Sequence, residues 1–146
     1  MRRANEIALY FIRLSEMQDE ESISNLKLQK LLYYSQGLHL ALYDQCLFPE
    51  PIEAWMHGPV VPKIYQKYKA NFSKVVSDQN SDAIPKFTDK EREVLDEVYN
   101  VYGQYSAWKL REMTHDELPW KDTPKGAVIT PQLMKDYFKT LVIENG

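Results

Sequence analysis

Residues 26–37 read Leu26-Lys27-Leu28-Gln29-Lys30-Leu31-Leu32-Tyr33-Tyr34-Ser35-Gln36-Gly37, and this stretch decides the fold. Its leucines recur at helical spacing, and the pattern continues to about Tyr43. Ser24 is placed to cap the helix, because its hydroxyl can accept a backbone N–H of the first turn. Tyr33 and Tyr34 point about 100° apart on a helix, so both are buried only if several sides are covered. The stretch therefore predicts a long central helix.

Helical patterns flank this central segment on both sides. The first runs from about Ala4 to Met17, with apolar residues on one face. The pattern Thr88-Asp89-Lys90-Glu91 is a capping box and predicts a further helix, which Gly103 ends. Other helices are expected to begin at Pro62, after Ser106 and after Thr130. Together these patterns predict a mainly α protein, a compact bundle of about six helices.

Helical spacing is lost between Cys46 and Val61. Pro49-Glu50-Pro51 separates two short extended pieces, because the residue before a proline is held out of helical geometry. We expect one small β-hairpin here, between the second and third helices, with Gly58-Pro59 breaking its second strand. Residues 70–86 are polar and aperiodic, which predicts a surface loop, and residues 119–129 are expected to be irregular.

The composition is that of one globular domain spanning residues 1–146. Hydrophobic residues make up 44% of the chain and charged residues 27%, enough for a core that needs no disulfide. The net charge of −3 argues against a protein that binds nucleic acid nonspecifically. The lone Cys46 fits a reducing compartment, and no apolar run reaches the roughly 18 residues that cross a membrane. These features predict a cytoplasmic protein.

Signatures of catalysis are missing from the sequence. The five glycines form no phosphate-binding loop, and there is no Gly-x-Ser-x-Gly nucleophile motif. Cys46 has no histidine near it in sequence to act as a base, so we expect a small buried side chain at the start of a strand. A helix-turn-helix that reads DNA is a weaker alternative, because the later helices begin with few basic residues. We expect no enzyme, no catalytic residue and no cofactor.

The three histidines do not form a local metal motif. His39, His57 and His115 are far apart in sequence, although they could converge in space. A ligand set of His115 with Asp116 is conceivable, whereas His39 lies between apolar positions and is expected to be packed. Asp116 and Glu117 are adjacent, and the usual interpretation of such a pair is solvated charge. We therefore expect no metal site, while an enzyme built from a spatial cluster stays an open alternative.

One order of motifs is distinctive. The helix of residues 26–37 is followed by Leu47-Phe48, by Ile52-Glu53-Ala54-Trp55 and by His57-Gly58-Pro59-Val60-Val61-Pro62. Later come His115, Glu117, Pro119, Trp120 and Lys121. Over residues 4–125 this order resembles the Panacea antitoxin domain, a bacterial family that includes phage-associated GepA-like and SocA-like antitoxins.

The resemblance implies a protein that binds a cognate protein toxin and neutralises it directly. Toxins of such systems include enzymes that modify tRNA or nucleotides, among other folds. The alternative that the resemblance leaves open is a SocA-like proteolytic adaptor, which delivers a bound toxin to a protease. Neither function requires a membrane or direct binding of nucleic acid.

Residues of the family motif are expected to maintain the fold, because a binding domain should keep its scaffold and vary its surface. This fold-motif set is Leu28, Lys30, Leu31, Tyr34, Gly58, Pro59, His115 and Trp120. Contacts with the toxin are expected in the loop from Asn71 to Lys86 and at nearby exposed aromatic side chains. The predicted partner-binding residues are Tyr68, Phe72, Lys74 and Asp78, together with Trp55 and His57, for which a role in maintaining the fold is favoured over direct contact.

Overall fold

The computed structural model describes residues 1–18, 23–69 and 86–145. These residues form mostly helices, with one small sheet, as the sequence predicts. In chain order the elements are α1 (Ala4–Gln18), α2 (Asn25–Tyr43), β1 (Ile52–Trp55), β2 (Gly58–Val60), α3 (Pro62–Lys67), α4 (Asp89–Tyr102), α5 (Ala107–His115), α6 (Leu118–Lys121), β3 (Val128–Ile129) and α7 (Pro131–Asn145). The predicted loop of residues 70–86 lies outside the described residues except for Lys86.

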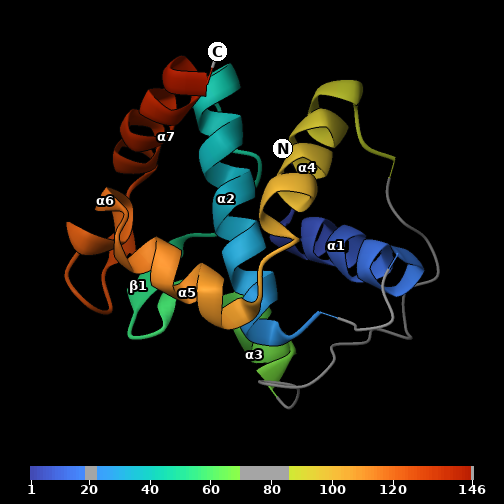
Figure 1. Cartoon of the computed structure of the whole chain (residues 1–146), viewed down its shortest axis with the longest axis horizontal. Coiled ribbons are helices and arrows are strands. Elements are labelled where there is room, and N and C mark those ends of the chain that lie inside the picture. The colour runs from blue at the N-terminus through green and yellow to red at the C-terminus, as the bar shows by residue number, and fades with distance from the viewer. Residues whose placement is uncertain (19–22, 70–85, 146) are drawn as a thin grey trace.

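Helix α2 is the central element, with α7 on one side, α4 on the other and α1 and α5 across its lower half (Figure 1). Ser24 caps it as predicted, because its hydroxyl accepts the backbone N–H of Lys27 at 3.2 Å. Tyr33 and Tyr34 are both fully buried. This confirms that helices cover the central one on several sides.

The other helix starts follow local sequence chemistry. Thr88 and Glu91 form the predicted capping box at the start of α4, and the Ser106 hydroxyl accepts the Lys109 backbone N–H at α5. Pro62 begins α3, where its missing N–H leaves no helical hydrogen bond unmade. The Thr130 hydroxyl accepts the backbone N–H of Leu133 in the first turn of α7.

The β-hairpin lies further along the chain than the sequence analysis placed it. Its strands are β1 and β2, and Met56 and His57 form the turn between them. Gly58 and Pro59 were expected to break a strand, yet they belong to β2 and pair with Trp55 and Ala54. A proline is accommodated because the strand order is β2-β1-β3, which makes β2 an edge strand that needs fewer donors.

Two further elements replace the irregular segment expected at residues 119–129. Helix α6 begins at Leu118, and β3 pairs antiparallel with β1 through Ile129 and Ile52. Such short elements carry too few residues for a periodic pattern, so their partners determine them rather than their own sequence.

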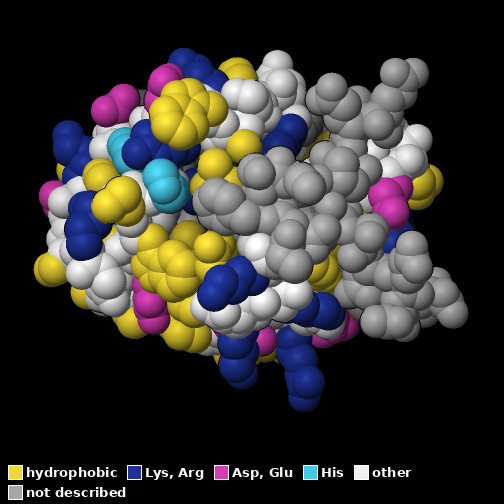
Figure 2. Space-filling model, turned by 90° about the horizontal axis from the view of Figure 1, so that it is seen from below, with side chains coloured by type: hydrophobic (Ala, Val, Ile, Leu, Met, Phe, Trp, Pro, Cys, Tyr) yellow, Lys and Arg dark blue, Asp and Glu magenta, His cyan; other side chains and the backbone are white. Residues whose placement is uncertain are grey.

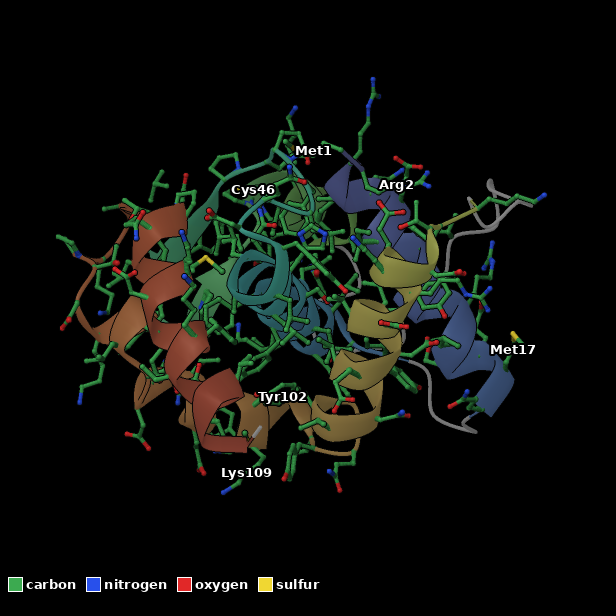
Figure 3. The ribbon with its side chains drawn as sticks, turned by 90° about the horizontal axis from the view of Figure 1, so that it is seen from above. Met1, Arg2, Met17, Cys46, Tyr102 and Lys109 are labelled. Carbon is green, nitrogen blue, oxygen red and sulfur yellow. The ribbon has the colours of Figure 1, made fainter. Side chains whose placement is uncertain are left out.

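The core surrounds α2 and is sealed by aromatic rings. Figure 3 shows Tyr102 on the inner side of α4, where its ring stacks on Tyr34 at 3.6 Å between centroids. On the opposite side Phe138 of α7 covers Gly37, and a Cβ on that glycine would lie 2.2 Å from the Phe138 ring. The glycine therefore allows α7 to approach α2 closely.

Candidate partner-binding site

A buried lysine of α2 contacts the second strand of the hairpin. Lys30 is fully buried, and its Nζ donates a hydrogen bond to the Pro59 carbonyl oxygen at 3.2 Å. Gly58 adopts a φ of +112°, and a Cβ there would lie 2.7 Å from Lys30 Cε and 2.9 Å from Thr114 Oγ1. The position thus requires glycine for its backbone conformation and for the space that the lysine occupies.

The charge of Lys30 is poorly compensated. Within the described ranges no carboxylate forms an ion pair with it. Loss of solvent on burial, followed by the positive charge of Arg111, lowers its pKa to about 7. The amine is therefore partly neutral at physiological pH, although it has no access to solvent for chemistry of its own.

Helix α5 places an arginine and a tryptophan beside the hairpin turn. Arg111 Nε donates to His57 Nδ1 at 3.0 Å, and its guanidinium carbon lies 4.5 Å from the centre of the Trp108 ring. Trp108 is 56% exposed and Met56 in the turn is 72% exposed. We call Met56, His57, Trp108 and Arg111 the tip surface. On the end of the molecule seen in Figure 2, hydrophobic, basic and histidine side chains lie next to one another.

The junction of α5 and α6 supports the hairpin from its other side. His115 stacks on Trp120 at 4.0 Å between centroids, and Trp120 Nε1 donates to the Trp55 carbonyl oxygen at 2.7 Å. Desolvation, followed by the charge of Arg111, lowers the pKa of His115. Its buried Nε2 has no hydrogen-bond partner in the part of the chain described, which fits a neutral ring. These contacts join the α5–α6 junction to the hairpin, and the role of His115 and Trp120 in the fold stays a prediction.

Glu117 corrects the expectation that Asp116 and Glu117 are solvated charges. Its carboxylate is buried and accepts hydrogen bonds from the hydroxyls of Tyr33 at 2.9 Å and Tyr34 at 2.8 Å. Desolvation raises the pKa of Glu117 to about 7, although the two hydrogen bonds act in the opposite direction. Asp116 is exposed, so only half of the interpretation holds.

Three of the predicted partner-binding residues, Tyr68, Trp55 and His57, belong to the part of the chain that the structure describes. The expectation of an exposed aromatic side chain is wrong for Tyr68, which is 4% exposed because it packs into the core. Trp55 and His57 are half-buried at the hairpin turn. Phe72, Lys74 and Asp78 lie outside the described residues, so their role stays a prediction.

Sequence reasoning named His57 of the tip surface but missed Met56, Trp108 and Arg111, because it grouped Trp108 with the apolar residues of its helix. Leu110 is fully buried, and a residue two positions away lies about 200° around the helix from it. Trp108 therefore faces outward when Leu110 faces the core, and this phase difference was the available signal. Met56 carried no such signal, since its exposure follows from the position of the turn.

The remaining chemistry is limited. Among residues 1–18, 23–69 and 86–145 no group of three His, Cys, Asp or Glu side chains is arranged to hold a metal ion. None of the described helices is long and apolar enough to cross a membrane. Cys46 is half-buried ahead of β1 rather than fully buried at a strand start, and burial raises the pKa of its thiol. His39 is 8% exposed and its Nδ1 contacts the Gln45 carbonyl oxygen at 2.6 Å.

The structure is thus a helical bundle in which α5 and α6 contact a β-hairpin, with apolar and basic side chains exposed at the hairpin turn. Residues 28–121 match the family described as antitoxin SocA-like, Panacea domain, and the chain belongs to that family. It is also similar to Antitoxin SocA of Caulobacter vibrioides (strain NA1000 / CB15N), with 44% identity over 54 residues. That match covers 37% of this chain and 29% of the relative. No solved structure matches the chain.

Proposed function

We propose that residues 1–146 act as one antitoxin domain that neutralises a cognate protein toxin in the cytoplasm by binding it directly. Membership of the SocA-like antitoxin family supports the role of an antitoxin with a toxin partner. The exposed apolar side chains of the tip surface carry the proposal of direct binding. A specific and stable interface usually buries more than about 1,000 Å² in total.

The tip surface has the composition of an interaction site. Tryptophan and arginine dominate the residues whose truncation weakens protein interfaces most, and methionine is also enriched there. Trp108 and Met56 expose large apolar areas although nothing in their own helix or turn requires it. Their backbone is firmly placed, since Trp108 lies in the first turns of α5 and Met56 in a paired hairpin. A rigid apolar tip of this kind loses little conformational entropy on binding.

The test is co-expression of the chain with the protein encoded by the neighbouring gene, scored by growth rescue and by co-purification. Trp108→Asp and Met56→Asp should each abolish rescue and the complex. Val101→Asp is the matched control, because Val101 is also exposed, at 37%, but lies on α4 in a hollow bordered by Tyr102 and Leu141. Circular dichroism and thermal unfolding check that each variant folds.

Rescue by the wild-type chain together with a stoichiometric complex supports direct neutralisation. Rescue that disappears in a strain lacking a cellular protease indicates the alternative, a proteolytic adaptor. A complex that survives both tip variants but is lost in Val101→Asp would place the interface on α4 and contradict the proposed site.

A further inference from the structure

Arg111 is fixed in a conformation that leaves one edge of its guanidinium open. His57 Nδ1 accepts a hydrogen bond from the Arg111 Nε–H group, with 3.0 Å between the two nitrogens. Because a guanidinium can only donate, His57 Nδ1 must be the unprotonated ring nitrogen. The Trp108 ring lies against the guanidinium at 4.5 Å. One edge and one face are thus held, while the four N–H groups of Nη1 and Nη2 make no hydrogen bond to a described residue.

Among the described residues, the positive charge of Arg111 has no partner of opposite sign. In the described segments every ion pair involves other residues, and two acidic neighbours of Arg111, Glu112 on α5 and Asp116 just after it, are exposed and form no ion pair with it. After desolvation, the positive charge of Arg111 is the next cause that lowers the pKa values of Lys30 and His115. These neighbours therefore experience the charge of Arg111 and do not neutralise it. An arginine preorganised at this position has the properties of one half of an intermolecular ion pair.

We propose that the open Nη edge of Arg111 binds the carboxylate of an aspartate or glutamate from the protein partner, with Trp108 and Met56 covering an apolar side chain next to that carboxylate. The inference rests on the proposed function and specifies the partner's chemistry. The Nη1 and Nη2 donors form a planar fork that matches the two oxygens of a carboxylate.

A protein carboxylate fits this site better than a nucleic-acid backbone. Binding to a polyanion relies on several phosphate contacts at once, whereas this chain has a net charge of −3 and one such fork on the tip surface. Trp108, which lies against the guanidinium, and Met56, next to His57 in the hairpin turn, are apolar and exposed, and they favour an apolar partner side chain. The partner segment should therefore combine one acidic residue with an adjacent hydrophobic one.

The first experiment measures the affinity of the purified chain for the neighbouring gene's product. Arg111→Met should weaken binding by at least about 30-fold, since truncating one partner of a desolvated ion pair commonly has such an effect. Arg111→Lys keeps the charge but loses the fork, and should weaken binding by about 10-fold. Arg3→Met makes the same charge change at an exposed position on the N-terminal side of α1 and should leave affinity within about 2-fold.

The second experiment needs no toxin. The Arg111 Nε–H signal in an NMR spectrum of the free chain is followed during titration with 3-phenylpropionate, with 3-phenylpropionamide as the uncharged control and inorganic phosphate as the competing anion. We expect a saturable shift with the carboxylate, little change with the amide, and a weaker response to phosphate.

The outcomes separate the two proposals. If the complex forms but both Arg111 variants bind within 2-fold of wild type, the carboxylate site is wrong and the antitoxin function stands. If no complex forms yet Arg111 responds selectively to the carboxylate, the site is supported and the proposed toxin is wrong. A phosphate response that exceeds the carboxylate response, or no response to either, overturns the inference.

Discussion

Two ionisable side chains, Lys30 and Glu117, are buried along the same face of α2, and the fold treats them differently. Glu117 is reached by two phenolic hydroxyls from that helix, those of Tyr33 and Tyr34. Lys30 comes from the helix itself and donates to one acceptor, the carbonyl oxygen of Pro59. Neither has an oppositely charged partner in the described residues, and burial moves the pKa of each to about 7, from below for the acid and from above for the amine.

The difference shows which of the two charges the fold depends on. Removing the Glu117 carboxylate would leave two buried hydroxyls without their acceptor, and unsatisfied buried groups are costly. Removing the Lys30 ammonium would leave one carbonyl oxygen without a donor, while its alkyl chain could be replaced by another apolar one. Hence the acid is part of a completed polar cluster, and the amine is a charge that the hairpin tolerates.

The largest expected effect is on the pH dependence of stability in the variant Lys30→Met. In Lys30→Met the buried amine is absent, so the variant should be more stable than wild type at pH 6. Between the folded pKa of about 7 and the unfolded value of 10.5, the unfolded chain binds the proton that the folded chain lacks. Wild-type stability therefore rises with pH across this window, and the gap between the two proteins should narrow by on the order of 5 kcal/mol. Urea unfolding at several pH values measures it, and a gap that does not change with pH would contradict a buried, destabilised ammonium.

A smaller but still large effect is expected from the glycine beneath Lys30. Gly58→Ala introduces a Cβ at a φ of +112° and 2.7 Å from Lys30 Cε, so strain and overpacking add. We expect a loss of about 4 kcal/mol in the free energy of unfolding. Gly126→Ala is the matched control, because Gly126 has a φ of +86° with nothing within 4 Å of a Cβ, and should lose only about 1 kcal/mol. Equal losses in the two variants would mean that the lysine yields easily and that only backbone strain matters.

The sequence predicted the helices better than it predicted either buried site. Ser24, Thr88 and the leucine spacing of α2 act within a few residues, so the sequence alone indicates those helices correctly. Gly58 was interpreted as a strand break, because its role depends on Lys30, a contact between residues 28 positions apart. Glu117 was interpreted as solvated, because its burial is set by hydroxyls that come from more than 80 residues earlier in the chain. Local rules identify elements, whereas polar clusters depend on their packing.

The acid should show a pH dependence opposite to that of the lysine. Between the unfolded pKa of 4.5 and the folded value of about 7, the folded chain holds a proton on Glu117 that the unfolded chain has lost. Wild-type stability should therefore fall as pH rises through this window, by about 3 kcal/mol from this residue. Glu117→Gln removes that contribution, so the difference between the two unfolding curves isolates it from other carboxylates. Parallel curves from pH 4.5 to 7 would show that Glu117 titrates normally in the folded protein.

The smallest effect concerns the two hydroxyls that complete the acid's cluster. Tyr34→Phe keeps the ring that stacks on Tyr102 and removes only the donor to Glu117. At pH 8, where Glu117 is ionised, we expect a loss of about 2 kcal/mol, the usual range for a hydrogen bond to a charged group. At pH 4 the acceptor is neutral, and the loss should shrink to about 1 kcal/mol. Tyr105→Phe should change stability by less than about 0.5 kcal/mol at both values, because no described residue bonds its hydroxyl. If Tyr34→Phe lowers the free energy of unfolding equally at pH 4 and pH 8, the hydrogen bond does not depend on the charge of Glu117. Glu117 and Lys30 would then differ only in how they are packed.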